Sequence, residues 1–348
     1  MLYELRTSKK ISKKTINNQT VREALNLSKK FPKSDSQQEL TLKNLRDFQW
    51  DDWVKCTEDP SVPLEKKLAL SILVNAFHKD ERIQTLRPHM ISIPGGTFQM
   101  GLSSKFVSSV VLKYKKVGVK REWIEKETPA FQTHVDPFCL ARYPVTNYEY
   151  YCFLKECPNK EIPSSWAYCR YPKERANHPV YTISRNSAQN YCSWLSKKTQ
   201  KHYRLPTEKE WEFAAGGGKQ FEFPWGNRFR ASNCNTLESR LLTTTPVGIY
   251  PQGNSPFGIS DMAGNVEEYV SGNYFPYPGG KIIRDDLFKV TGSVNYPMTR
   301  GGSFARSSDL ARIRRRHGFY PKEIYVIGFR LACSSLEAGE EWLERRKQ

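Results

Sequence analysis

The chain has 348 residues, enough for two domains or for one large domain with an appendage. Its mean hydropathy is −0.65. Its longest apolar run, residues 68–77, is shorter than the roughly 18 residues that a membrane helix needs, so we predict no membrane span. The N-terminus lacks the apolar stretch of a secretory signal, which favours a cytoplasmic location.

The net charge is +18 and the isoelectric point is near 9.5. Such a charge favours contact with polyanions, but it does not choose between nucleic acid, anionic lipid and acidic protein. A basic protein without any polyanionic partner is the alternative. The 8 cysteines form no C-x-x-C pair and no dense framework, so we expect them to be reduced and mostly buried.

The first 90 residues differ from the rest of the chain. Residues 1–40 are rich in lysine and poor in hydrophobic periodicity, which predicts a basic, flexible tail. Between residues 41 and 90, apolar residues recur at helical spacing, and we expect a small helical appendage. Short strand-like runs and turns then begin at residue 91 and continue to about residue 335.

Within this region, residues 92–101 predict a β-hairpin with a Gly-Gly turn. Three helices interrupt the strands. One begins after Thr146, one after Ser184, and one after Thr207, the last ending at Gly216–Gly218. Almost no helical periodicity follows until residues 336–348, where we expect a C-terminal helix. The pattern predicts an α+β fold with long irregular loops and without an internal repeat.

Several of these segments resemble the formylglycine-generating enzyme, or sulfatase-modifying factor, family. The matching pieces occur in the family's order and are IPGGTFQMG (93–101), YPVTNYEYYCFL (143–154), HPVYTISRNSAQNYCSWL (178–195), YRLPTEKEWEFAAGGG (203–218), PWGN (224–227), TPVGIYPQGNSPFGISDMAGNVEEYV (245–270), RGGSF (300–304) and GFRLA (328–332). The resemblance implies that residues 91–335 adopt this family's variant of the C-type lectin fold. Members of the family include oxidases, sulfoxide synthases, inactive paralogues and ligand-displaying proteins, so the fold alone does not assign the function.

The resemblance also implies where copper would bind. The family's oxidases hold Cu(I) with two cysteines, three and eight positions after the serine of the Gly-Gly-Ser turn, because thiolates suit this soft ion. Here the serine is Ser303, and the two positions carry Arg306 and Ala311. A guanidinium is a permanent cation without an acceptor. We therefore predict a vestigial site without copper.

The related sulfoxide synthases bind iron through three histidines. In this chain His78 and His89 are eleven residues apart and do not share one helix face, so we expect no iron. Calcium is a further expectation from the resemblance. The stretch DMAGNVEEY would supply Asp261, the carbonyl oxygens of Gly264 and Val266, and Glu268 as hard oxygen ligands.

The alternative to calcium is a loop held by its own hydrogen bonds, with Glu268 paired to an arginine. The tryptophans that flank this glutamate in the family are here Glu267 and Tyr269. This departure alters the wall of the cleft that the resemblance implies.

Two basic stretches predict a surface for an anionic partner. Residues 103–126 carry Lys113, Lys115 and Lys116, with Phe106, Val110 and Val111 at the spacing of an amphipathic helix. The second stretch, residues 300–316, holds one acid, Asp309, and six arginines; those assigned to the surface are Arg306, Arg312, Arg314, Arg315 and Arg316. The alternative is that these arginines form internal ion pairs and solvated charge.

Together these features predict a non-catalytic or catalytically altered domain that serves as a binding or scaffold module. Its partner would be a protein, engaged through the N-terminal helices or the cleft, or an anionic molecule such as nucleic acid. The competing hypothesis is a metal-dependent oxidoreductase, forming formylglycine or catalysing a related oxidation, with a non-standard site near Ser303.

Overall fold

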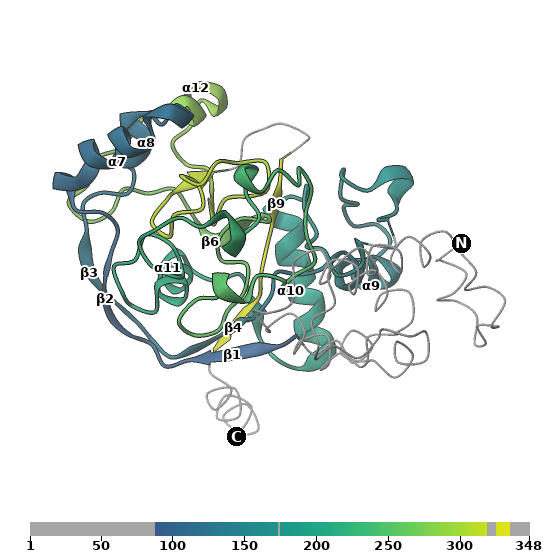
Figure 1. Cartoon of the computed structure of the whole chain (residues 1–348). Helices are drawn as coiled ribbons and strands as arrows, with labels where there is room; N and C mark the ends of the chain where they lie inside the picture. Colours follow the sequence, from purple (N-terminus) through teal and green to yellow (C-terminus); the bar gives the residue numbers. More distant parts are fainter. Residues whose placement is uncertain (1–87, 173–174, 319–324, 335–348) are drawn as a thin grey trace, which may run out of the picture.

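The computed structural model describes residues 88–172, 175–318 and 325–334 (Figure 1). The predicted tail (1–40), the predicted C-terminal helix (336–348) and nearly all of the predicted helical appendage (41–90) lie outside these residues. The helices are α7 (Val107–Lys113), α8 (Arg121–Glu125), α9 (Asn147–Glu156), α10 (Arg185–Thr199), α11 (Glu208–Gly216) and α12 (Asp286–Thr291). The strands are β1 (Met90–Ile93), β2 (Gly96–Met100), β3 (Phe131–Val135), β4 (Phe138–Ala141), β5 (Tyr203–Arg204), β6 (Glu267–Asn273), β7 (Pro297–Arg300), β8 (His317–Gly318), β9 (Ile327–Gly328) and β10 (Ala332–Ser334).

The strands form two four-stranded sheets and one separate pair. The first sheet has the order β1-β4-β10-β5, so β4 pairs with strands from both ends of the described chain. The second sheet has the order β8-β7-β6-β9, in which only the β6–β9 pairing is parallel. Mostly antiparallel sheets with helices outside any alternating βαβ pattern confirm the α+β prediction. No helix in the described part of the chain has the length and apolar character needed to cross a bilayer.

The Gly95–Gly96 bend corrects the predicted hairpin. The flanking strands β1 and β2 do not pair with each other, because β1 pairs with β4 and β2 pairs with β3. A Cβ atom on Gly95 would lie 2.4 Å from the carbonyl oxygen of Val135, and its φ of 72° also favours glycine. The glycines therefore carry the chain from one sheet to the next rather than closing a hairpin.

The three predicted helices are confirmed, and each begins at its predicted cap. Thr146 and Thr207 cap α9 and α11, and in both helices the third residue is a glutamate that completes a capping box. The Ser184 side chain accepts from the Ser187 N–H group at the start of α10. The short helix α12, capped by Asp285, escaped the sequence analysis because its six residues show too little periodicity.

Two aromatic-rich clusters form most of the core. In the first, Tyr150 of α9 stacks on Tyr191 of α10, with the ring centroids 6.1 Å apart. The second cluster lies around Trp211 of α11 and includes Phe138 of β4 and Ile313. Because Ile313 belongs to the arginine-rich stretch, this core fixes that stretch to α11 and to the sheets.

Residues 103–126 fold as a compact helical insertion. It consists of a 3-10 turn (Ser104–Phe106), α7, a second 3-10 turn (Lys115–Val117) and α8. Val107, Tyr114, Val119 and Ile124 form its buried cluster, and Val110 and Val111 pack against it. The predicted amphipathic helix is therefore present, but Phe106 lies on its solvent side with 47% of its surface exposed. In Figure 1 the insertion lies beside α12, apart from α9 and α10.

Candidate functional site

The Gly301–Gly302–Ser303 turn follows β7 and starts the arginine-rich stretch. Both glycines have positive φ angles, 93° and 67°. A Cβ atom on Gly302 would lie 2.8 Å from the backbone nitrogen of Ala311, so glycine permits the close return of the chain. Ser303 is buried, and its hydroxyl has no hydrogen-bond partner among the described residues.

The two positions at which the resemblance places thiolates lie in different surroundings. The Arg306 side chain is 39% exposed, and its Nε atom lies 3.7 Å from Oε1 of Glu267. Its guanidinium carbon also lies 5.0 Å from the ring centre of Tyr325. Ala311 is fully buried in an apolar cluster with Phe223 and Cys234. Neither position offers a donor atom to a soft metal.

Glu267 organises a polar group that we call the Glu267 cluster; its members are Glu267, Thr299, Arg306, His317 and Tyr325. Oε2 of Glu267 accepts a hydrogen bond of 2.9 Å from the Thr299 hydroxyl and lies 2.7 Å from Nδ1 of His317. The His317 and Tyr325 rings stack at an angle of 24°. Three of its members lie on neighbouring strands of the second sheet: Glu267 on β6, and Thr299 of β7 and His317 of β8, which are register partners.

The charge of Glu267 is stabilised inside the protein. Burial alone would raise the pKa of this carboxyl, but His317 and Arg306 outweigh burial and hold the pKa below its usual value. The cationic side chain at one family cysteine position is thus paired with a carboxylate at a family tryptophan position. Sequence reasoning noted both departures separately but did not predict that they touch.

Burial keeps two thiols of the described residues in the protonated form. Burial raises the pKa of Cys234, the thiol in the Ala311 cluster, to about 12. Cys333, which faces Cys139 across β10 and β4, has its pKa raised to about 12 for the same reason. Both thiols are therefore protonated at neutral pH, and a metal would have to displace their protons in order to bind. Cys139 and Cys192 are also buried, as expected, although Cys169 is exposed.

Among the described histidines, His178 is neutral and already has a polar neighbour. Burial, with a contribution from Arg175, lowers the pKa of His178 to about 3, and its Nδ1 lies 2.9 Å from the Thr244 hydroxyl. Within the described ranges, no three His, Cys, Asp or Glu side chains come together in a way that could hold a metal ion. His78, weighed above as an iron ligand, lies outside these ranges.

The four residues of the predicted calcium loop are buried, and its two carboxylates already have protein partners. The two carboxylate oxygens of Glu268 accept hydrogen bonds of 2.6 Å each from the Arg330 guanidinium, and one also accepts from the Trp211 indole. Asp261 accepts from the Gly248 N–H group at 2.6 Å, and burial raises its pKa to about 6. The contacts match the alternative, in which Glu268 pairs with an arginine and the loop is held by its own hydrogen bonds. Gly264 takes part through its N–H, which donates to the Gly301 carbonyl, and Val266 is part of the buried core.

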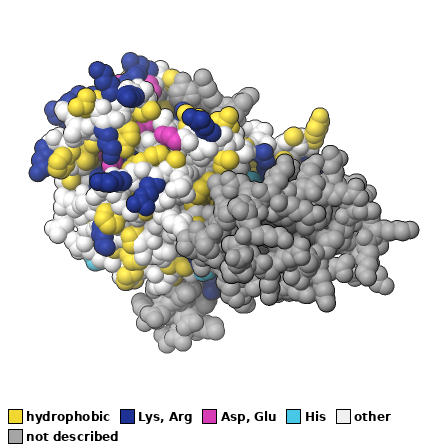
Figure 2. Space-filling model, viewed as in Figure 1, with side chains coloured by type: hydrophobic (Ala, Val, Ile, Leu, Met, Phe, Trp, Pro, Cys, Tyr) yellow, Lys and Arg dark blue, Asp and Glu magenta, His cyan; other side chains and the backbone are white. Residues whose placement is uncertain are grey.

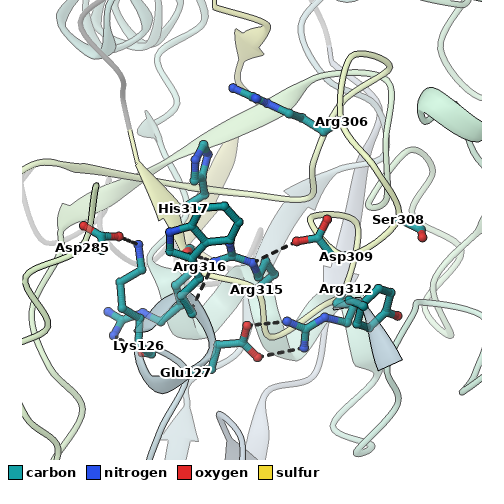
Figure 3. Close-up of polar contacts among 12 residues, drawn as sticks. Lys126, Glu127, Asp285, Arg306, Ser308, Asp309, Arg312, Arg315, Arg316 and His317 are labelled. Atoms are coloured by element: carbon teal, nitrogen blue, oxygen red, sulfur yellow. Dashed lines mark hydrogen bonds and ion pairs between the residues drawn. The ribbon is translucent and has the colours of Figure 1, made fainter. Parts of the chain in front are cut away.

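Three of the predicted anion-binding arginines are buried, which corrects that prediction. Arg312 makes a bidentate pair with Glu127, at 2.9 and 2.6 Å. Arg316 pairs with Glu208 at 2.7 and 3.0 Å. Arg315 lies 3.5 Å from Asp309. Figure 3 shows Arg312 directed toward Glu127 and Arg315 directed toward Asp309, whereas Arg306 lies apart from them.

The buried arginines hold the helical insertion on the domain. Besides Glu127, they bind backbone carbonyls of the same segment, since Arg315 donates to Trp123 and Arg316 donates to Lys126. Lys126 in turn forms a buried ion pair with Asp285, the cap of α12. Apolar residues such as Leu310 and Ile313 between the arginines were the sequence signal that this stretch lies inside.

The remaining cations of the predicted surface are more accessible. Arg314 is partly exposed and donates two long hydrogen bonds, to Gln220 and to the Phe221 carbonyl. Lys113 pairs with Glu222 but keeps 47% of its side chain exposed. Lys115 and Lys116 are exposed and form no ion pair with the described residues. The structure therefore separates the predicted surface into an internal arginine group and an exposed lysine group.

Comparisons with known proteins agree with the motifs and with this geometry. The sequence model for the Sulfatase-modifying factor enzyme 1-like domain matches residues 76–335. The Inactive C-alpha-formylglycine-generating enzyme 2 of Bos taurus is 27% identical, and the match covers 71% of this chain and 88% of that protein.

Two further similarities extend the comparison. The Hercynine oxygenase of Mycolicibacterium thermoresistibile is 29% identical over 60% of this chain, which spans only 53% of that protein. Among solved structures, PvdO from Pseudomonas aeruginosa has a TM-score of 0.54 and 27% identity, with 71% of this chain and 95% of that chain covered. The likeness to PvdO agrees with the mixed helix and sheet fold of this chain.

Proposed function

Because the chain belongs to the formylglycine-generating enzyme, or sulfatase-modifying factor, family but has Arg306 and Ala311 at the copper cysteine positions, we propose that it is a catalytically altered or inactive member. It acts as a binding or scaffold module for a protein or an anionic partner. The observation that carries this proposal is the pair of Arg306 and Glu267, which puts an ion pair where a soft-metal site would need thiolates.

The surroundings support this proposal in two ways. Ala311 packs into an apolar cluster whose single cysteine, Cys234, is protonated at neutral pH. Arg306 is neutralised by Glu267 rather than left as an unpaired cation. The name of the Bos taurus relative, an inactive enzyme, is consistent with such a loss.

We also propose the class of the partner, which is a protein or an anionic molecule. The exposed lysines of the insertion, Lys113, Lys115 and Lys116, are the anionic-partner surface, and Arg306 and Arg314 contribute only their exposed edges. A protein partner would bind the predicted N-terminal helices or the region of the Glu267 cluster. Nucleic acid is the other anionic candidate, and its binding would weaken steeply as salt rises. We also propose a cytoplasmic location.

A copper titration tests the altered site. Purified protein competes anaerobically for Cu(I) with a chromophoric Cu(I) chelator, beside the double variant Arg306→Cys/Ala311→Cys. We expect no stoichiometric Cu(I) binding by the natural chain and a gain of binding in the double variant. Stoichiometric binding by the natural chain would overturn the proposal.

A second candidate is an oxidoreductase with a non-standard metal site. The name of the Mycolicibacterium relative, an oxygenase, favours it, and Glu267 and His317 provide two adjacent ligand-type side chains. A third ligand would have to come from a group outside the described residues or from a rearrangement. Elemental analysis of freshly purified protein discriminates, because stoichiometric iron or copper supports the enzyme and its absence supports the module.

A further inference from the structure

The helical insertion presents an outer face that alternates lysines with large apolar side chains. We call this the outer face; its residues are Lys105, Phe106, Leu112, Lys113, Lys116 and Val117. Lys105 and Phe106 lie in the 3-10 turn before α7, Leu112 and Lys113 at the end of α7, and Lys116 and Val117 in the 3-10 turn after it. All six side chains are exposed. The opposite side packs inward through Val107 and Tyr114.

The outer face is basic, and among its lysines only Lys113 has an acidic partner in the described part of the chain, Glu222. Residues 103–121 contain six cations and no acid. Lys105, Lys115 and Lys116 form no ion pair with described residues, and Glu222 is shared by Lys113 and the Tyr114 hydroxyl. In Figure 2 cations and hydrophobic side chains gather where Figure 1 places α7, α8 and α12.

Its apolar side chains are unusually accessible. Leu112 is 72% exposed and Val117 is 45% exposed. Burial of such side chains in a partner is favourable, because apolar surface leaves water. The insertion is also fixed on the domain, since the buried pairs of Arg312 with Glu127 and of Lys126 with Asp285 anchor its C-terminal end. The outer face is therefore a preformed surface on a segment that is anchored to the domain.

The chemistry of this face distinguishes between anionic partners. Protein surfaces that bind single-stranded nucleic acid combine a basic groove with aromatic rings that stack on bases. Two of the three apolar side chains of the outer face, Leu112 and Val117, are instead aliphatic. Aliphatic residues among lysines suit the boundary between lipid headgroups and acyl chains, where the apolar groups insert and the long lysine side chains reach the anionic headgroups. We propose that the outer face docks on an anionic lipid bilayer as a peripheral contact. This inference rests on the proposed binding-module function and names its anionic partner.

Vesicle sedimentation tests the inference with the full chain. The probes are phosphatidylcholine vesicles with and without phosphatidylserine, at low and high salt. We expect binding that requires phosphatidylserine. At low salt, Lys105→Glu/Lys116→Glu should weaken binding by roughly thirtyfold or more, because each lysine near such a surface adds to the attraction by the anionic headgroups. Leu112→Ser/Val117→Ser should weaken binding even where the charge is unchanged.

The matched control is Lys197→Glu/Lys201→Glu, which makes the same charge change at exposed positions at the far end of α10. We expect it to lower vesicle binding much less than the outer-face variants do. Equal losses in both charge variants, or no loss in the Leu112 and Val117 variant, would overturn the inference. All variants are first compared by urea unfolding, so that a loss of fold is not read as a loss of binding.

Two further outcomes separate this inference from the proposed function. Outer-face variants that lose affinity for a fluorescent oligonucleotide but not for vesicles would overturn the lipid assignment in favour of nucleic acid. Absence of vesicle binding would overturn the inference and leave the copper result as it stands. Stoichiometric copper binding, in contrast, would overturn the altered-site proposal whatever the vesicles show.

Discussion

Arg312 has 1% of its side chain exposed, and Glu127 is its bidentate partner. Removing two charges from water is costly, and their attraction offsets this cost only when the geometry is good and the remaining hydrogen bonds are made. The guanidinium also lies 5.5 Å from the ring centre of Tyr114. Buried arginines of this kind depend on their partners, so the loss of one partner leaves an uncompensated buried charge.

Arg312→Met should lower the free energy of unfolding by about 3–5 kcal/mol, because it leaves the Glu127 carboxylate buried and unpaired. Arg314→Met, at a partly exposed neighbour with only long hydrogen bonds, should cost less than about 1 kcal/mol. Urea unfolding followed by tryptophan fluorescence measures both. A double variant with Glu127→Gln should recover part of the loss, and equal costs for the two single variants would contradict the internal role of Arg312.

Lys126 should make the free energy of unfolding increase as the pH rises through the alkaline range. Burial, followed by the nearby Arg315 charge, lowers the pKa of Lys126 from 10.5 to about 8. Between these values the unfolded chain holds a proton that the folded chain has released, so raising the pH stabilises the fold. Unfolding free energies measured from pH 8 to 10 should rise more steeply in the natural chain than in Lys126→Met. Parallel pH profiles would show that Lys126 keeps its ordinary pKa.

At the scale of elements, local sequence signals located the helices. The same signals did not identify which strands pair with each other. The capping boxes at Thr146 and Thr207 involve residues three positions apart, so sequence alone located the starts of α9 and α11. The Gly95–Gly96 bend was misread as a hairpin because the partners of β1 and β2 lie tens of residues downstream.

The candidate site was predictable only in part for the same reason. The motif identified the vestigial positions Arg306 and Ala311, but Glu267 touches Arg306 across strands. Arg312 and Glu127 are 185 residues apart in sequence, and no local pattern joins them. An ion pair that closes over such a separation depends on the tertiary fold, so sequence left open whether the arginines face solvent or the interior.

The loop that contains Asp261 and Glu268 allows a test at this scale. Because Arg330 already neutralises Glu268, we expect calcium and EGTA to give the same thermal midpoint. A calcium site filled at 100 times its Kd would add about 2.7 kcal/mol to the stability, which is readily detected. Asp261→Asn is the control, since asparagine tolerates the left-handed backbone of this position. A calcium-dependent rise that this variant removes would contradict our reading of the loop.

At the scale of the whole molecule, the family's fold is present, and we propose that the chemistry of its central turn differs. Glycines still bring the chain from Ser303 back to Ala311, and Trp211 still packs beside the turn. The thiolate positions instead hold an ion-paired cation and a buried methyl group. The arginines around them hold a basic insertion in place, which links the altered site to the proposed docking surface.

Oxygen consumption tests this account most directly. Full-length protein is supplied with Cu(I), a thiol reductant and a cysteine-containing peptide, and oxygen uptake is followed with an electrode beside a reaction that lacks the protein. The account predicts that the protein adds no uptake to this background and leaves the peptide cysteine unchanged by mass spectrometry. Catalytic uptake with conversion of the cysteine to formylglycine would contradict it.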